Sequence, residues 1–169
     1  LEASLEAGFE AVKVNTVLIK TINDEDLDRF FDFVKFRPVS LRFIELMRTR
    51  DNVDYLSRHH FRASVVREKL LANGWQLQAR SEGAGPAEEF RHAEYQGRIG
   101  LIAPYSKDFC KSCNRLRISA RGELHLCLFG EGGTSIRDLL QSADQREELQ
   151  EKIMELMQFK RYSNFLHEG

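Results

Sequence analysis

Two β-branched, largely apolar runs, each preceded by a helical pattern, set the fold class that this chain can adopt. The run VKVNTVLI (12–19) follows a short helical segment that ends near Gly8. The run SLRFIEL (40–46) follows the helical pattern NDEDLDRFFDFVKF (23–36). Near-continuous apolar strands between helices are typical of parallel sheets that helices cover. Residues 1–47 therefore predict the order α-β-α-β in an α/β fold.

Capping residues predict where the next helices begin and end. Asn23 or Asp24 is a suitable N-cap for the second helix, with acidic residues in its first turn. Residues 48–60 are polar and predict a loop. A further helix is expected in SVVREKLLANGW, beginning at Ser64 as N-cap and ending at Gly74.

The pattern changes after the turn-rich segment SEGAGPAEEF (81–90). Short strands are expected there in GRIGLIAPY, RLRISA and ELHLCLF, after an earlier short strand in WQLQA. A hairpin should turn at Arg121 and Gly122, and the C-terminal segments SIRDLL and SADQREELQEKIMELMQF read as helices. The segment GEGG (130–133) is expected to join a strand to a helix, and His59 and His60 should point apart and are assigned no role.

Charge and cysteine content exclude several classes of function. The net charge is −1, so no overall basic field attracts nucleic acid or an anionic membrane. No apolar run approaches the roughly 20 residues that a transmembrane helix needs. Three cysteines, an odd number, argue against a secreted disulfide framework and favour reduced thiols in the cytoplasm. The chain begins without Met, in an expected helix, which indicates a piece of a longer protein.

The three cysteines lie within one segment of 18 residues, CKSCNRLRISARGELHLC. Cys110 and Cys113 have C-x2-C spacing, and Cys127 on the second strand of the expected hairpin returns beside them. Three thiolates leave one position of a metal centre open. Either His125 or His167 completes a zinc site, or the thiolates hold a 4Fe-4S cluster whose last iron binds a non-protein ligand.

Two arginines favour the cluster with an external ligand. Arg115 and Arg117 lie on one face of an extended segment directly after Cys113. A guanidinium group stays charged and binds phosphate through paired hydrogen bonds. The segment therefore predicts a centre that binds a small phosphate-bearing molecule.

The segment PYSKDFCKSCNRLRISARGELHLCLFGEGG (104–133) resembles the C-terminal cluster motif of the molybdenum cofactor biosynthesis protein A family, the radical-SAM GTP 3',8-cyclases. KVNTVLI and LRFIELM are similar to two barrel strands of that family, in the same order. The resemblance implies the C-terminal part of an incomplete (β/α) TIM-type barrel over residues 1–105. Over residues 106–169 it implies a small α+β cluster-binding domain with a β-hairpin.

The resemblance also implies roles for single residues. The three cysteines would hold a 4Fe-4S cluster whose open iron takes the guanine of GTP. The other implied contacts are with GTP for Lys13, Arg115, Leu116 and Arg117, with S-adenosylmethionine for Met47, and with the phosphates of GTP for Arg42. The residues alone favour a structural role for each: Lys13 as a strand-edge lysine, Arg42 as an ion-pair partner and Met47 as a core residue.

For the full-length protein, the resemblance implies conversion of GTP to (8S)-3',8-cyclo-7,8-dihydroguanosine 5'-triphosphate in molybdenum cofactor biosynthesis. A second 4Fe-4S cluster, bound by a CxxxCxxC motif, would cleave S-adenosylmethionine. This chain has no such motif and ends at Gly169 without the family's Gly-Gly tail, so we expect it to be inactive alone.

The expected partners are GTP and S-adenosylmethionine, and a homodimer is left open, whereas no nucleic acid or membrane is expected. Two alternatives remain open at this point. One is a zinc-stabilised binding module, and the other is an electron-relay cluster domain of another radical-SAM maturase.

Overall fold

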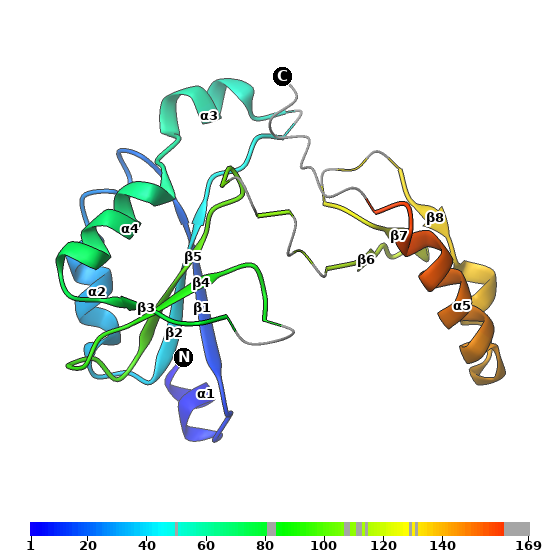
Figure 1. The fold of residues 1–169 in the computed structure, drawn as a ribbon, viewed down its shortest axis with the longest axis horizontal. Coiled ribbons are helices and arrows are strands. Elements are labelled where there is room, and N and C mark those ends of the chain that lie inside the picture. Colours follow the sequence, from blue (N-terminus) through cyan, green and yellow to red (C-terminus); the bar gives the residue numbers. More distant parts are fainter. Residues whose placement is uncertain are drawn as a thin grey trace. The chain divides into compact units, whose positions relative to one another are not determined.

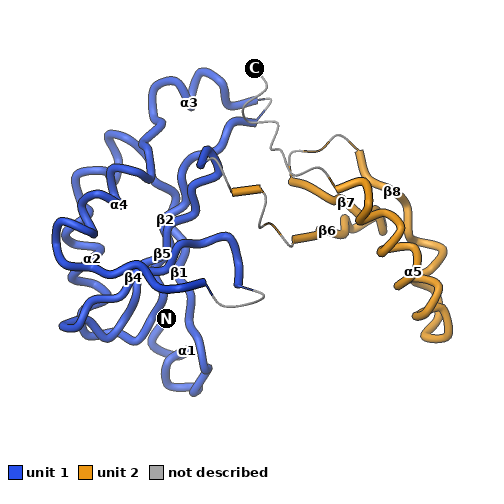
Figure 2. The backbone as a smooth tube through the Cα atoms, viewed as in Figure 1, with its two compact units in different colours: residues 1–106 blue, residues 107–169 orange. Residues whose placement is uncertain are grey.

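The chain divides into two compact units, residues 1–106 and 107–169, each with a sheet of its own (Figure 2). The computed structural model describes residues 1–49, 51–80, 84–106, 109–110, 113, 115–128, 130 and 132–160. Within these ranges, no helix is long and apolar enough to cross a membrane.

The first unit contains a mixed sheet of five strands in the order β1-β2-β5-β4-β3 (Figure 1). Strands β1, β2 and β5 are parallel, and β4 and β3 continue the sheet in antiparallel pairing. The strands are β1 Val12–Leu18, β2 Val39–Glu45, β3 Gln76–Leu77, β4 Glu88–Arg91 and β5 Arg98–Ile102. The α/β fold and the parallel pairing of the first two strands, which the sequence predicts, are confirmed.

The helices of this unit are α1 Glu2–Glu6, α2 Leu27–Lys35, α3 Val53–His59 and α4 Ala63–Ala72. Gly8 follows α1 with a φ of +71°, and Gly74 follows α4 with a φ of +80°. Both glycines adopt the left-handed conformation that ends a helix without strain on a side chain. The two predicted helix ends are therefore confirmed.

The predicted start of α2 is wrong. The helix begins at Leu27, with Asp26 as the N-cap residue. Asn23 and Asp24 instead close the preceding turn, because their side-chain oxygens accept the N–H groups of Ile19 at 2.9 Å and Thr21 at 2.7 Å. Short polar side chains often make such local bonds in place of a helix cap.

The loop expected over 48–60 and the cap expected at Ser64 are also wrong. Residues 53–59 form α3, which buries no residue, so no apolar periodicity reveals it in the sequence. Helix α4 begins one residue before Ser64, at Ala63, whose N–H donates to Glu45 Oε2 at 3.3 Å. The Glu45 carboxylate on strand β2 thus accepts the first N–H of the helix, a role that the side chain of an N-cap residue usually fills.

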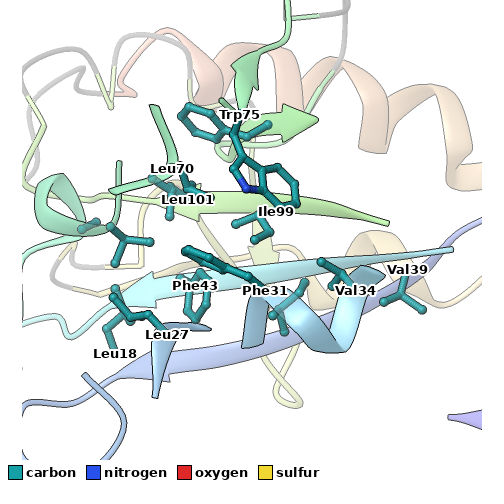
Figure 3. Packing of buried hydrophobic residues seen from close by; sticks show 14 residues of the cluster. Leu18, Leu27, Phe31, Val34, Val39, Phe43, Leu70, Trp75, Ile99 and Leu101 are labelled. Atoms are coloured by element: carbon teal, nitrogen blue, oxygen red, sulfur yellow. The ribbon is translucent and has the colours of Figure 1, made fainter. Parts of the chain in front are cut away.

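The core of the first unit lies between one face of the sheet and helices α2 and α4 (Figure 3). Phe43 of β2 lies at its centre and packs edge-on against Phe30 and Phe31, with ring centroids 5.5 and 6.5 Å apart. Phe31 also contacts Trp75, at 6.0 Å. The buried cluster comprises Leu18, Leu27, Phe31, Val34, Val39, Leu41, Phe43, Ala63, Val66, Leu70, Trp75, Phe90, Ile99 and Leu101.

Gly97 lets the chain enter β5 directly against the end of α2. Its N–H donates to Val34 O at 3.0 Å. A Cβ at this position would lie 2.6 Å from Arg37 O and 2.7 Å from Val39 O. Since both neighbours are backbone atoms, a side chain cannot be accommodated by a rotamer change.

The second unit has a small antiparallel sheet, β6-β7-β8, followed by helices. Gly122 N–H donates to Ser119 O at 3.0 Å in the turn between β6 and β7, which confirms the predicted hairpin. Leu124 and Ile136 are its buried apolar residues within the described ranges. The elements are β6 Arg117–Ile118, β7 Glu123–His125, β8 Thr134–Ser135, the 3-10 helices η1 Arg137–Leu140 and η2 Ala143–Gln145, and α5 Arg146–Met157.

The segment 130–133 lies between strands β7 and β8. The expectation that it joins a strand to a helix is therefore wrong. The C-terminal helices are confirmed. Ser142 caps η2 with a capping box, in which the Gln145 side chain accepts the Ser142 N–H at 3.0 Å.

We predict that Phe43→Ala lowers the free energy of unfolding by about 3–5 kcal/mol, because it leaves a cavity between α2 and the sheet. Urea unfolding followed by the fluorescence of Trp75, the single tryptophan, measures this loss. The control is Phe36→Ala, since Phe36 is 74% exposed whereas Phe43 is fully buried. Equal effects of the two substitutions would contradict this description of the core.

Candidate functional site

The C-x2-C segment forms a closed turn. The Cys113 N–H donates to Cys110 O at 3.2 Å, the bond that closes a β-turn. This bond holds the backbones of the two cysteines close together. Residues 111 and 112 lie outside the described ranges. All three cysteines of the chain are half-buried, and none of them forms a disulfide.

The three thiols interact through their charges. Burial raises the pKa of the Cys110 thiol, and the negative charges of Cys127 and then Cys113 raise it further. The Lys160 ammonium acts in the opposite direction and lowers that pKa. The effects of Cys113 and Cys127 on Cys110 indicate that the three cysteines lie near one another, although Cys127 comes from the far end of the hairpin.

The donor set fits a group held by three thiolates. Burial and the charges of the two other cysteines oppose ionisation of the Cys110 thiol, so a cation bound at this site would compensate the charge, as metal ligation does. Among the described residues, no three His, Cys, Asp or Glu side chains are arranged as a ready-made metal site. The turn and hairpin thus supply the donors without fixing their final geometry.

His125 is engaged elsewhere on its strand. A Cβ on Gly133 would lie 2.8 Å from His125 Cε1 and Nε2, so the imidazole packs over that glycine. His125 Nε2 also lies 4.0 Å from Glu123 Oε2. The other zinc-ligand candidate, His167, lies outside the described residues.

Arg115 and Arg117 are exposed on either side of the half-buried Leu116. Arg117 begins β6 and pairs with His125 across the hairpin. With the described residues, neither arginine side chain forms an ion pair. The two guanidinium groups are therefore available to an anion from solvent, directly after the cysteine turn.

Lys13 and Arg42 lie on the face of the first sheet that α2 and α4 do not cover. Lys13 is paired in register with Ser40, and Arg42 with Asn15. The Lys13 side chain is exposed and makes no hydrogen bond or ion pair within the described ranges. Because side chains alternate between faces, the entry of Leu41 and Phe43 into the core places Ser40 and Arg42 on this side.

Arg42 is the centre of a polar network on this open face. Its Nη2 donates to Glu89 Oε1 at 2.7 Å, and Ser40 Oγ donates to Glu89 Oε2 at 3.2 Å. Arg98 Nε lies 4.0 Å from the same carboxylate. Gly100 makes room for the pair, since a Cβ there would lie 2.9 Å from Arg42 Cγ.

Met47 lies in the loop that follows β2, at the carboxyl end of the parallel strands. Asn52 clamps this loop, because its Nδ2 donates to Met47 O at 2.9 Å and its Oδ1 accepts the Thr49 N–H at 2.7 Å. The Arg48 N–H donates to Tyr105 Oη, 2.9 Å away on the segment after β5. Ligand sites of parallel sheets commonly lie at this end of the strands.

A buried carboxylate supports the same loop. Glu45 ends β2, and its Oε1 lies 2.8 Å from His60 Nε2. The ring of His60 packs edge-on against Tyr105, with centroids 5.3 Å apart. His59 instead stacks on Tyr55, at 4.4 Å, so the two histidines point apart as the sequence predicts.

The structure thus brings the predicted residues together in two groups. The three cysteines and residues 115–117 belong to the second unit, whereas Lys13, Arg42 and Met47 belong to the first.

Several residues that support these groups were not found from the sequence. They are Glu45, Asn52, His60, Glu89, Tyr105 and Lys160. One signal was present, because Glu45 is a carboxylate within the otherwise apolar run FIEL. The other partners are distant in sequence, and no local pattern marks them.

The sequence model described as Molybdenum Cofactor Synthesis C matches residues 39–166. The chain therefore belongs to this family, and the resemblance noted in the sequence is confirmed. Similar curated proteins are named GTP 3',8-cyclase. Those of Yersinia pestis and Vibrio parahaemolyticus are 53% identical over 169 residues, and that of Haemophilus influenzae is 51% identical. The matches cover 100% of this chain and 52%, 51% and 50% of those relatives, so the chain spans about half of their length.

We predict a coupling free energy of about 1–2 kcal/mol between Arg42 and Glu89. Their side chains are only 15% and 23% exposed, so solvent screens the pair weakly. A double-mutant cycle with Arg42→Ala and Glu89→Ala, read from urea unfolding, measures the coupling.

The control cycle uses Arg29 and Asp26, whose side chains are 82% and 44% exposed. That pair should give about 0.5 kcal/mol or less. Coupling in the Arg42 cycle no larger than in this control would show that the network does not hold Arg42.

Proposed function

We propose that this chain is the C-terminal half of a GTP 3',8-cyclase of molybdenum cofactor biosynthesis. The observation that carries the proposal is the group of three half-buried cysteines without a disulfide, followed directly by two exposed arginines that form no ion pair with the described residues. The match over the whole chain to relatives of that name supports it. The full-length protein would convert GTP to (8S)-3',8-cyclo-7,8-dihydroguanosine 5'-triphosphate by radical chemistry.

Residues 1–105 would be the C-terminal part of a (β/α) barrel, and residues 106–169 the cluster-binding domain. Three parallel strands with helices on one face and charged side chains on the other support the barrel. Strand β1 lies at the edge of the sheet, and its outer side has no strand partner among the described residues. A further parallel strand of the full-length protein would pair there.

Cys110, Cys113 and Cys127 would hold a 4Fe-4S cluster. When bound, such a cluster supplies one iron without a protein ligand, a Lewis-acidic position for the guanine of GTP. Arg115 and Arg117 would bind the triphosphate through charge-assisted hydrogen bonds. Leu116, half-buried between them, would contact the nucleotide and fix the spacing of the two guanidinium groups.

Lys13 and Arg42 would contact GTP from the open face of the first sheet. The exposed ammonium of Lys13 has no ion-pair partner among the described residues and is suited to this role. Arg42 donates through Nη2 to Glu89 and through Nε to Ser40, which leaves the N–H donors of Nη1 for a phosphate oxygen. Glu89 would thus orient Arg42 rather than compete with the substrate.

Met47 would contact S-adenosylmethionine from the loop that Asn52 clamps. All three cysteines of the chain are assigned to one site, so the cluster that cleaves S-adenosylmethionine needs thiolates beyond residues 1–169. The chain alone should therefore form no 5'-deoxyadenosine and no cyclised nucleotide. A homodimer and a cytoplasmic location stay predictions.

We predict that the anaerobically reconstituted chain binds about four irons, the content of one cubane cluster. Replacing any one of the three cysteines by alanine should remove most of this iron, as measured by elemental analysis and visible absorption. His125→Ala is the control and should leave the iron content unchanged, because His125 packs on Gly133.

The zinc alternative gives the opposite result. A single zinc per chain that persists during reconstitution, and that His125→Ala releases, would contradict the cluster and favour a zinc-stabilised module.

We predict that Arg115→Ala or Arg117→Ala weakens GTP binding to the iron-loaded chain by about 10- to 100-fold. Each variant loses a charge-assisted hydrogen bond to phosphate, of about 1.5–3 kcal/mol. Isothermal titration calorimetry measures the dissociation constant. Arg117→Lys should also bind weakly, since an ammonium cannot form the planar fork.

Arg121→Ala is the matched control, because Arg121 is an exposed arginine in the hairpin turn. It should bind GTP as the unmodified chain does. If GTP leaves the magnetic resonance of the cluster unchanged and both alanine variants bind normally, the electron-relay alternative is favoured instead.

A further inference from the structure

Lys160 is a buried lysine to which none of the roles above is assigned. It follows α5, and the residue is only 7% exposed. Its Nζ donates a hydrogen bond of 2.6 Å to the carbonyl oxygen of Arg115. That carbonyl lies between the cysteine turn and the start of β6. One side chain from the end of the last helix therefore holds the backbone of the predicted GTP-contacting segment.

A buried ammonium is costly unless an anion compensates its charge. Within the described ranges, Lys160 forms no ion pair with a carboxylate, and its hydrogen-bond partner is a neutral carbonyl. The carbonyl that it holds belongs to the second residue after Cys113, so the buried ammonium lies beside the cysteine segment.

We propose that Lys160 is a positioning residue of the three-cysteine site, which both supplies the counter-charge for the thiolate-bound group and tethers the segment from Arg115 to Arg117. The inference rests on the proposed function, because it requires a negatively charged group at the cysteines. Three thiolates and the metal centre that they bind would carry negative charge. This charge would compensate the buried ammonium of Lys160.

The two parts of this role have different physical consequences. A positive charge beside an iron–sulfur cluster stabilises its more negative, reduced form and so raises its reduction potential. The hydrogen bond to Arg115 O instead fixes the backbone that presents the two guanidinium groups. Loss of the charge should therefore change the potential, and loss of the tether should change GTP affinity.

The test uses the chain of residues 1–169, whose three cysteines allow no other thiolate-bound cluster. Lys160→Met removes the charge and the donor but keeps a side chain of similar length. Lys160→Arg keeps the charge and alters the hydrogen bond. Lys152→Met is the control, since Lys152 pairs with Glu155 on the exposed side of α5 at 2.8 Å. Thermal melting of each variant, followed by circular dichroism, verifies that it is folded.

We expect Lys160→Met to shift the reduction potential of the reconstituted cluster to more negative values and to weaken GTP binding about tenfold. Lys160→Arg should keep the potential of the unmodified chain and bind GTP less tightly, and Lys152→Met should change neither quantity. Electron paramagnetic resonance during a redox titration gives the potential, and calorimetry gives the dissociation constant.

The outcomes separate this inference from the proposed function. An unmodified chain that takes up no iron would overturn both. A chain that holds iron and binds GTP, with Lys160→Met unchanged in potential and affinity, would overturn the role of Lys160 alone. If Lys160→Met does not fold, a changed potential in the folded, charge-conserving Lys160→Arg would overturn the counter-charge.

Discussion

One-sided burial of the first sheet is the constraint on which the rest of this unit depends. Helices α2 and α4 pack on one face, where Leu41 and Phe43 enter the core (Figure 3). Since successive strand residues point to opposite faces, this packing presents Ser40 and Arg42 on the other face. A shift of β2 by one residue would bury Arg42 and expose Phe43. The same apolar contacts that stabilise the fold therefore fix the register of the candidate binding residues.

Short-range patterns in the sequence predicted the features that short-range physics determines. The β-branched runs gave β1 and β2, the positive φ of Gly8 and Gly74 ended their helices, and a turn at Gly122 formed the hairpin. The C-x2-C spacing likewise identified the cysteine turn. In each case the residues that decide the structure are neighbours in the sequence, so their spacing alone carries the information.

Features that depend on distant partners were missed. Helix α3 buries no residue, and α4 begins where the carboxylate of Glu45, eighteen positions earlier, accepts its first N–H. Glu89 meets Arg42 across 47 positions, and Lys160 reaches Arg115 across 45. Polar partners of this kind follow no period, because any segment that the fold brings close can supply them. The cysteine spacing identified the candidate metal ligands in the sequence. The charged groups near them, such as Lys160, could be located only in the folded structure.

Gly97 and Gly100 have different meanings for genetic variation in this family, although both lie in or beside β5. At Gly97 the obstacle to any side chain is main-chain oxygen, so every missense change there acts by depleting folded protein. At Gly100 the obstacle is the Cγ of Arg42, the flexible stem of a residue proposed to contact the nucleotide. Under the proposed role of Arg42, a missense change there would act first on substrate recognition. An abundance assay should therefore detect substitutions at Gly97, and an activity assay those at Gly100, although the two glycines are only three positions apart.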